Sequence, residues 1–453
     1  MFASVDPATG ESLARYASFD KEDLEPRLEA ARHAFLRWRE LPIEQRAEAM
    51  QKLADALRHH QQSLARLMAM EMGKPLSQGF AEVEKSAWCI EHYCQFAAEY
   101  LKPQHIETEA STSYAQHQPL GVILGIMPWN MPVWLAFRFA APTLMAGNSC
   151  LIKPDPHVLG CAHLLDDVIE EAGLPSGLLQ HLPLENSLTE YTIRHPVIAG
   201  VSFTGSDRAG AQVAKIAASE VKPAVLELGG SDASIVLADA DIQKAAEVIA
   251  ASRLINNGQS CIAAKRILVE GAVYDAFIEA FGAELQQYRF GFPLSEACRL
   301  GPLARQDLRH NLHQQVLDSV ALGANCLFGG EVPEGDGFYY PPTLLTDVTP
   351  EMRVFSEETF GPVAAVIKVA DEAQAISLAN MSKYGLGGSV WSTPERGLHV
   401  ASRLYTGQVA VNDLVKSDPR LPSGGVKRSG YGNELGPQGI LEFVNAQQVW
   451  VGE

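Results

Sequence analysis

Cys261 stands in a polar turn, Gly258-Gln-Ser-Cys-Ile-Ala-Ala-Lys-Arg266, between two runs that are typical of regular elements. A cysteine becomes a nucleophile where its surroundings favour the thiolate and a substrate can reach it. A structural cysteine sits among apolar neighbours instead. Upstream, Glu227-Leu-Gly-Gly230 places a carboxylate beside two glycines. Together, the two segments predict nucleophilic chemistry with a carboxylate that can move protons.

The size and charge of the chain narrow the classes of protein. A chain of 453 residues predicts two or three domains. A net charge of −18 argues against a surface for nucleic acid or anionic membranes. Seven scattered cysteines without Cys-x-x-Cys predict neither disulfides nor a zinc site, so no metal is expected. The start, Met1 to Pro7, lacks the basic and apolar regions of a signal peptide, so we expect a cytoplasmic protein.

Residues 119–147 form the most apolar stretch of the chain. Its length would suit a membrane span, but three prolines interrupt it and Asn130 and Arg138 lie inside it. We therefore predict a buried strand over 121–127, a sharp turn over 128–132 and a helix from about residue 133.

Short β-like runs alternate with helical patterns along most of the chain. Residues 20–100 read as helices, and 103–118 as a protruding hairpin. Strands are then predicted at 149–153, 198–203, 224–228 and 233–237, with helices at 161–172 and 209–219. A second series follows Cys261, with strands at 266–269 and 363–369 and a helix at 272–289. This rhythm predicts an α/β fold with doubly wound sheets.

A dinucleotide site is suggested only weakly by the residues themselves. The chain has no Gly-x-Gly-x-x-Gly, but the strand ending at Phe203 runs into Thr204-Gly-Ser-Asp-Arg-Ala-Gly210 and then a helix. Such a turn can present backbone N–H groups to a phosphate, or it can simply join a strand to a helix. Both interpretations stay open on this evidence.

Seven segments, taken in order, resemble the motifs of the aldehyde dehydrogenase superfamily. They are Met127-Pro-Trp-Asn-Met-Pro132, Lys153-Pro154, Phe203-Thr-Gly-Ser206, Glu227-Leu-Gly-Gly230, Gly258-Gln-Ser-Cys261, Glu358-Thr-Phe-Gly-Pro362 and Pro422-Ser-Gly-Gly-Val-Lys-Arg-Ser-Gly-Tyr-Gly432. The resemblance implies the aldehyde dehydrogenase fold. We expect a Rossmann-type cofactor domain (1–102 and 119–229), an α/β catalytic domain (230–430) and a small bridging or oligomerisation element (103–118 and 431–453).

The resemblance assigns roles to three catalytic residues. Cys261 would attack an aldehyde carbonyl, Asn130 would help to form the oxyanion hole, and Glu227 would activate the water that hydrolyses the thioester. Without the resemblance, an asparagine between prolines can simply cap a turn, and a glutamate before two glycines can be solvated.

Cofactor contacts follow in the same way, for NAD or NADP. The positions that match the family's contacts are Trp129, Lys153, Gly205, Ser206, Gly210, Glu358 and Phe360. Pro156 stands where many relatives carry a glutamate that binds the adenosine ribose and repels a 2′-phosphate. Asp155 is expected to point away if the strand continues. We therefore expect both cofactors to work, with a slight preference for NAD.

Two positions resemble the carboxylate contacts of succinate-semialdehyde dehydrogenases, namely Arg138 and Ser417. Arg138 on an apolar helix needs an anionic partner, which could be the substrate or an internal Asp or Glu. Many such enzymes have a second arginine six positions before the nucleophilic cysteine, where this chain has Ile255. Some also have a second cysteine two residues after the nucleophile, where this chain has Ala263. Lys416 and Arg420 could supply the missing charge, or form an exposed pair.

The closing motif departs from the family at one position. Ser423 replaces the usual phenylalanine of the closing motif, which would widen the entrance or reshape the cofactor side.

The leading prediction is NAD(P)-dependent oxidation of succinic semialdehyde, with another aliphatic or aromatic aldehyde as the alternative. A thiol esterase, or a binding or structural member of the family, stays open as a different class. An apolar terminal strand predicts a homodimer or homotetramer. The net charge predicts no nucleic-acid or membrane partner.

Overall fold

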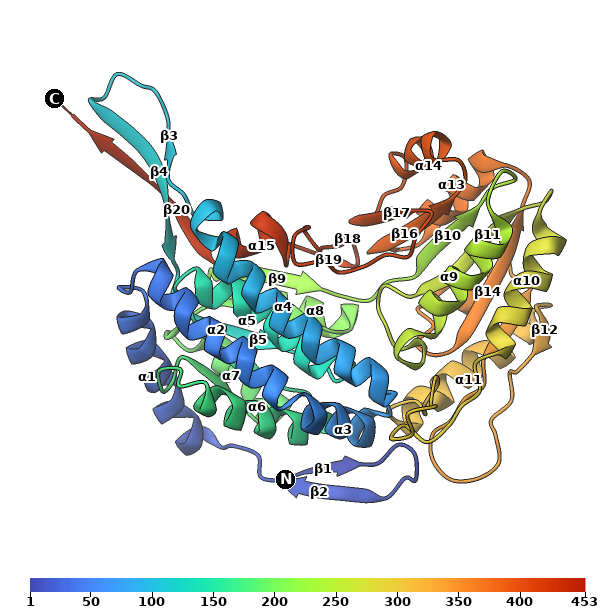
Figure 1. Ribbon diagram of the computed structural model, residues 1–453, viewed down its shortest axis with the longest axis horizontal. Coiled ribbons are helices and arrows are strands. Elements are labelled where there is room, and N and C mark those ends of the chain that lie inside the picture. Colours follow the sequence, from blue (N-terminus) through green and yellow to red (C-terminus); the bar gives the residue numbers. More distant parts are fainter. Residues whose placement is uncertain (453) are drawn as a thin grey trace.

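The computed structural model describes residues 1–452 and has two lobes, each built on its own sheet, with a hairpin projecting from one of them (Figure 1). The blue and green elements form the first lobe, and the yellow and orange elements form the second. This confirms the predicted α/β class. The domain boundaries given above remain a prediction.

The first lobe contains a six-stranded sheet in the order β19-β9-β8-β5-β6-β7. Its strands are β5 (Val122–Ile126), β6 (Ser149–Lys153), β7 (Leu179–His181), β8 (Ile198–Thr204), β9 (Ala224–Glu227) and β19 (Gly430–Tyr431). All neighbours are parallel except β19, which runs antiparallel to β9. Parallel strands are apolar on both faces, and this explains the apolar residues of β5, which lies near the start of the apolar run over 119–147.

Helices cover both faces of this sheet. Ile123, Cys150 and Ile152 point into the core made with α2 to α6, whereas Val122, Leu124 and Leu151 point into the core made with α1, α7 and α8. The helices of this lobe are α1 (Lys21–Trp38), α2 (Ile43–His59), α3 (Gln61–Met72), α4 (Leu76–Tyr100), α5 (Pro132–Met145), α6 (Leu159–Glu171), α7 (Asn186–Arg194), α8 (Asp207–Ser219), α15 (Gly436–Leu441) and the 3₁₀ turn η1 (Pro156–Val158). The strand, turn and helix predicted from residue 121 are thus confirmed.

The second lobe contains a seven-stranded sheet in the order β12-β13-β14-β11-β10-β16-β17. Its strands are β10 (Asp232–Val236), β11 (Ala264–Glu270), β12 (Asn325–Phe328), β13 (Thr343–Thr346), β14 (Val363–Val369), β16 (Gly387–Trp391) and β17 (Gln408–Val411). Its helices are α9 (Ile242–Leu254), α10 (Tyr274–Gln286), α11 (Gln306–Ala321), α12 (Arg353–Ser356), α13 (Glu372–Met381), α14 (Pro394–Ala401) and the 3₁₀ turn η2 (Ile255–Gly258). Helices α9 and α10 cover one face, and α11 to α14 the other.

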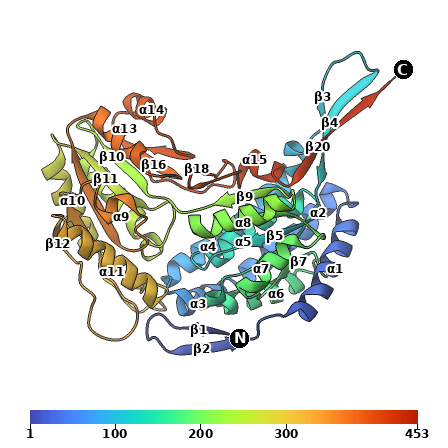
Figure 2. The same ribbon diagram turned by 180° about the vertical axis from the view of Figure 1, so that it is seen from behind.

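The projecting sheet joins distant parts of the chain. Strand β4 (Thr112–Pro119) pairs with β3 (Gln104–His105) and with the terminal strand β20 (Val444–Val451), which runs beside it from Val444 opposite Pro119 to Val451 opposite Thr112. Figure 2 shows this sheet from behind, extending away from both lobes. The predicted hairpin and terminal strand are therefore confirmed. Two small pairs, β1 (Phe2–Val5) with β2 (Ser12–Tyr16) and β15 (Tyr384–Gly385) with β18 (Val426–Lys427), complete the strands.

Within residues 1–452, no helix has both the length and the apolar character needed to cross a bilayer. The apolar helix α5 is instead enclosed by α2, α4 and α6 of its own lobe. Its burial comes from protein neighbours, as the prolines and Arg138 in this region led us to expect.

A buried carboxylate fixes the turn that precedes α5. Glu82 on α4 accepts hydrogen bonds from the backbone N–H groups of Val133 and Trp134, each at 3.0 Å. It also pairs with the ammonium of Lys74, which donates to the backbone oxygen of Asn130 at 3.1 Å. The first N–H groups of a helix have no partner within the helix, and an anion there is favoured by the helix dipole. Glu82 and Lys74 therefore hold the 128–132 turn in place from both ends.

Replacing Glu82 by Gln should lower the free energy of unfolding by about 3 kcal/mol, because the charge of Lys74 would remain buried without its partner. Chemical denaturation of the two proteins would measure the difference. The matched control is Glu84→Gln on the same helix, where an exposed pair with Arg58 is lost and a change below about 1 kcal/mol is expected. Equal effects of the two substitutions would contradict the role given to Glu82.

Candidate active site

A cavity of about 450 Å³ lies between the lobes, and side chains from both line it. Ten of the residues singled out by the sequence lie in its wall: Trp129, Asn130, Arg138, Gly205, Ser206, Glu227, Cys261, Glu358, Phe360 and Ser417. Lys153 and Gly210 are not among its lining residues. The structure thus brings together nearly all of the predicted residues, from positions almost 300 residues apart.

The turn before Cys261 has an unusual backbone. Asn256, Asn257 and Gly258 follow one another with φ values of 53°, 60° and 76°, in the left-handed region. Asparagine and glycine tolerate this region best. At Gly258 a Cβ atom would also lie 2.3 Å from the carbonyl carbon of Gly361. The side chain of Asn257 donates to the backbone oxygens of Gly73 and Pro302 at 2.8 and 3.0 Å, which ties the turn to neighbouring segments.

Asn130 contacts the segment between this turn and Cys261. The side-chain amide of Asn130 donates to the backbone oxygen of Gln259 at 3.1 Å, two residues before the cysteine. Burial raises the pKa of Cys261 to about 11, although the charges of Arg138 and Lys265 act in the opposite direction. The thiol is therefore protonated at neutral pH in this state, and its activation requires a base or the approach of positive charge.

Glu227 belongs to a buried cluster of three charged side chains. It lies at the end of β9, with Oε2 3.7 Å from Nη2 of Arg138, and Nε of Arg138 pairs with Oε2 of Glu434. All three side chains are at most 5% exposed. Burial raises the pKa of Glu227 to about 8; Arg138 opposes this shift and Glu434 adds to it. A carboxyl group with this pKa can take up and release protons near neutrality.

Arg138 is therefore matched by two internal carboxylates. Burial lowers the pKa of Arg138, but Glu434 and Glu227 outweigh burial and raise that pKa above its ordinary value. The internal ion pair, which was one of the two interpretations of this residue, is present. Arg138 also lines the cavity, so its contact with a substrate remains a prediction.

Sequence reasoning missed Glu434. It accepts a hydrogen bond from Ser202 Oγ at 3.2 Å in addition to its pair with Arg138. One signal was available, because Glu434-Leu-Gly436 repeats the tripeptide Glu227-Leu-Gly229 just after the closing motif. Ser423 exchanges two backbone hydrogen bonds with Glu434 and is buried. Ser423 is not among the cavity's lining residues, so a wider entrance is not the visible consequence of this substitution.

A second group of side chains in the cavity wall lies around Glu358. Glu358 Oε1 accepts from the backbone N–H of Gly230 at 3.0 Å and lies 3.4 Å from the ammonium of Lys265. The rings of Trp129 and Phe360 meet edge to face, with centroids 5.8 Å apart. These contacts connect the glycine-rich segment after Glu227 to the second lobe.

The residues beside the start of α8 suit a dinucleotide. Ser206 caps the helix, accepting from Ala209 N at 3.3 Å, and a Cβ at Gly210 would lie 2.5 Å from Leu228. Helix and strand therefore approach closely here, and the helix N-terminus faces the cavity through Gly205 and Ser206. Lys153, at the end of β6, is buried and forms no ion pair with any described residue. Burial lowers the pKa of Lys153, so a polar ligand such as a ribose hydroxyl would stabilise it.

Strand β6 ends at Lys153 and does not continue through Asp155, so the condition on which Asp155 was expected to point away is not met. It caps η1, and its Oδ1 lies 3.0 Å from the backbone nitrogen and 2.7 Å from Nδ1 of His157. Despite its burial, the contacts with His157 lower the pKa of Asp155. Its carboxylate is thus engaged within its own segment, next to Pro156.

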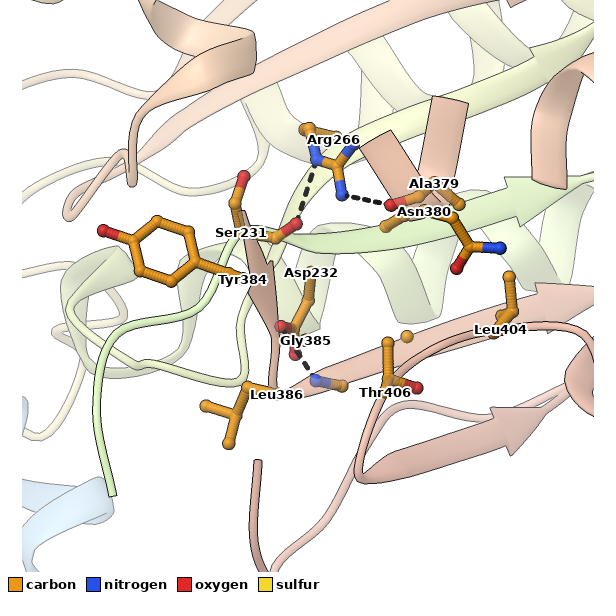
Figure 3. A pocket seen from close by; sticks show the side chains of 13 residues that line it. Ser231, Asp232, Arg266, Ala379, Asn380, Tyr384, Gly385, Leu386, Leu404 and Thr406 are labelled. Carbon is orange, nitrogen blue, oxygen red and sulfur yellow. Dashed lines mark hydrogen bonds between the residues drawn. The ribbon is translucent and has the colours of Figure 1, made fainter. Parts of the chain in front are cut away.

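The segment after Glu227 is anchored in the second lobe. Arg266 donates from Nε to the backbone oxygen of Ser231 at 2.9 Å and from Nη2 to that of Ala379 at 3.0 Å (Figure 3). Asp232 accepts from the backbone N–H of Gly387 at 3.0 Å. Burial raises the pKa of Asp232 to about 6. These bonds fix the chain where it passes from one lobe to the other, only a few residues beyond Glu227.

The loop after β17 brings Ser417 into the cavity wall, and Ser417 is itself buried. Its charged neighbours are engaged elsewhere: Lys416 pairs with Asp413 and Arg420 pairs with Asp418, both at 2.7 Å. The exposed-pair interpretation of these two residues fits their contacts.

Comparison with known proteins agrees with this geometry. The sequence matches the aldehyde dehydrogenase family over residues 1–449. It is 43% identical to a probable succinate-semialdehyde dehydrogenase [NADP(+)] of Synechocystis sp. over 450 residues, which cover 99% of each chain. It is 44% identical to the succinate semialdehyde dehydrogenase [NAD(P)+] Sad of Escherichia coli, covering 99% of this chain and 97% of that one. The crystal structure of succinic semialdehyde dehydrogenase from Streptococcus pyogenes in complex with NADP+ superimposes with a TM-score of 0.97, at 32% identity and full coverage of both chains.

Proposed function

The chain belongs to the aldehyde dehydrogenase family, and on this premise we propose that it oxidises succinic semialdehyde to succinate with NAD or NADP. The observation that carries the proposal is the meeting of Cys261, Asn130 and Glu227 around one cavity, which also reaches the N-terminus of α8. The relatives named above support the substrate and the cofactor. The test is the rise in absorbance at 340 nm when enzyme, aldehyde and oxidised cofactor are mixed.

In the first half of the reaction, the sulfur of Cys261 bonds to the aldehyde carbon, and the thiol proton passes to solvent water. The carbonyl oxygen becomes an oxyanion, for which the side-chain amide of Asn130 and a backbone N–H at the cysteine are the donors. Asn130 is preorganised for this role, because the turn that carries it is held by Lys74 and Glu82. A bound nicotinamide would supply the hydride acceptor, and loss of hydride from the thiohemiacetal carbon would leave a thioester on Cys261.

In the second half, water attacks the thioester and the acid is released. Glu227 takes the proton from this water, because its carboxyl group lines the same cavity as Cys261 and burial raises its pKa to about 8. Its cluster with Arg138 and Glu434 keeps the remaining negative charge balanced. The leaving thiolate of Cys261 is then ready for the next aldehyde.

The cofactor would lie along the α8 side of the cavity. Gly205, Ser206 and Gly210 would face the pyrophosphate, and Lys153 the adenosine ribose. Glu358 would bind the ribose next to the nicotinamide, with Phe360 and Trp129 as the apolar neighbours. Arg138 and Ser417 would lie toward the distal end of the substrate. The hydroxyl of Ser417 forms no hydrogen bond within residues 1–452 and could make this contact, whereas Arg138 would share its charge with Glu434.

The projecting sheet supports the proposal of a homo-oligomer, dimeric or tetrameric. Strand β20 is an edge of this sheet, and Trp450 and Val451 on it are about half exposed. An edge strand offers unpaired backbone groups to a second copy, and closed symmetric assemblies satisfy both edges.

Replacement of Cys261 by Ala should abolish dehydrogenase activity and any ester hydrolysis, because no thioester can form without the sulfur. Binding of NAD, followed by calorimetry, should persist and shows that the variant is folded. Cys298→Ala is the matched control, since that cysteine lies outside the cavity and should leave turnover near the wild-type rate. A Cys261→Ala enzyme with more than a trace of activity would remove this residue from the mechanism.

Replacement of Glu227 by Gln should slow turnover more than it slows the initial burst of reduced cofactor, since the carboxylate is needed for thioester hydrolysis. The ionised form is the base, and burial raises the pKa of Glu227 to about 8. Wild-type turnover should therefore increase as the pH rises through about 8, and this increase should be absent in the variant. Stopped-flow absorbance at 340 nm measures both phases. Equal loss of burst and turnover would assign Glu227 to activation of the thiol instead.

Both cofactors should support turnover, with a modest preference for NAD. Pro156 offers no carboxylate to repel a 2′-phosphate, and Asp155 is held by His157. Steady-state kcat/KM values with the two cofactors should differ by less than about a thousandfold, or roughly 4 kcal/mol. In Pro156→Glu, the new carboxylate should shift the ratio further toward NAD. A larger ratio in the wild type would reveal a discriminating group elsewhere.

A further inference from the structure

Lys85 is a cation of the cavity wall that the assignments above leave without a role. It lies on α4, one turn after Glu82, and its side chain lines the same cavity as Cys261 and Ser417. Its ammonium lies 4.1 Å from the centroid of the Trp134 ring. Trp134 is one turn before Arg138 on α5, so Lys85 approaches the cavity beside that arginine.

We propose that Lys85 provides a further positive charge for the distal carboxylate of the substrate, beside Arg138 and the hydroxyl of Ser417. The proposal rests on the function given above and adds a residue to it. An ammonium and a hydroxyl offer hydrogen bonds to the two oxygens of a carboxylate. The aldehyde at the other end of the substrate would then face Cys261 and Asn130.

The other cations near the cavity already have ion-pair partners, which favours Lys85 as a ligand for the substrate carboxylate. Arg138 is matched by Glu434 and Glu227, Lys416 by Asp413 and Arg420 by Asp418. Lys85 forms no ion pair with any residue from 1 to 452. A carboxylate that enters the cavity therefore meets one cation, Lys85, without an ion-pair partner in the described chain, although Glu82 and Asp418 favour its charge from beyond ion-pair distance.

The surroundings of Lys85 suit a carboxylate ligand. Burial and the nearby Arg138 lower the pKa of Lys85 to about 8, so the amine is mostly charged at neutral pH but incompletely stabilised. The face of Trp134 attracts the cation but carries no negative charge that could neutralise it. An anionic ligand would restore the electrostatic stabilisation that burial removes, and the gain would be larger than for a solvated lysine.

The packing of α4 also brings Lys85 toward Ser417. Trp88, one turn further along α4, lies under the guanidinium of Arg420 at 5.4 Å from the ring centroid. Arg420 belongs to the same loop as Ser417, so this contact holds the loop against the helix that carries Lys85. Two segments more than 300 residues apart thereby form one wall of the cavity.

The test compares Lys85→Met and Lys85→Arg with the wild type, on succinic semialdehyde and on butanal, which has the same number of carbons but no carboxylate. Lys85→Met should lower kcat/KM for succinic semialdehyde by roughly 10- to 100-fold, the effect of one charged hydrogen bond. The loss on butanal should be at least tenfold smaller, and Lys85→Arg should recover most of the selectivity. Lys102→Met, just beyond the same helix and exposed, is the control for removing a charge from this part of the protein.

Binding of succinate provides a measurement that does not depend on turnover. In the Cys261→Ala background, isothermal titration should show succinate binding that weakens when Lys85→Met is added. Similar losses on the two aldehydes, or unaltered succinate binding, would overturn the proposal and leave Lys85 as a packing residue against Trp134. If Lys416→Met, and not Lys85→Met, removes the selectivity, the cation is Lys416.

The failure of the proposed function would look different. A wild-type enzyme that oxidises butanal as efficiently as succinic semialdehyde, and binds no succinate, would contradict both the substrate and the role of Lys85. A wild type that prefers succinic semialdehyde, with the preference retained in Lys85→Met, would contradict Lys85 alone.

Discussion

The buried guanidinium of Arg138, shared between Glu227 and Glu434, is the interaction on which the rest of the site depends. Three charged groups have been removed from water, and each is tolerated only because the others are present. The cluster contains two acids and one base, so one carboxyl group is left incompletely balanced. That imbalance, together with burial, raises the pKa of Glu227 to about 8. The same arrangement that stabilises the interior thus prepares a general base for neutral pH.

Cys261 is positioned in a different way, by a turn whose unfavourable backbone conformation is stabilised by neighbouring segments. Asn256, Asn257 and Gly258 adopt consecutive left-handed conformations, which cost free energy that the surrounding structure must offset. The Asn257 side chain supplies part of this compensation through its bonds to Gly73 and Pro302. Because Gly73 belongs to the first lobe and Pro302 to the second, the same asparagine that stabilises the turn also connects the lobes that enclose the cavity.

The fold was largely predictable because its signal is local. Strands buried on both faces must be apolar, and helices that cover them must be amphipathic, so β5, β6 and β8 could be read from short windows. The sites of Cys261 and Glu227 were found through neighbouring glycines and polar residues. Lys74, Glu82 and Glu434 were missed because an ionisable residue inside a helical or loop pattern is normally a surface residue. Their significance depends on partners far along the chain, as with Lys74 and Asn130, and no window of sequence contains both. The orientation of the Asp155 side chain was not predictable for a similar reason. It depends on the end of strand β6 at Lys153, which the sequence pattern does not mark.

An enzyme for a carboxylate-bearing aldehyde faces two conflicting electrostatic requirements. Its general base needs surroundings that hold a proton near neutral pH, whereas the distal carboxylate of its substrate needs positive charge. One arginine between both groups would serve neither well, because each anion would weaken its hold on the other. In this protein the charges are divided. Arg138 is committed to Glu227 and Glu434 close to Cys261, and its charge is among those that act on the thiol. Lys85 stands against Trp134 on the neighbouring helix, has no ion-pair partner among residues 1–452, and can therefore respond to the substrate carboxylate.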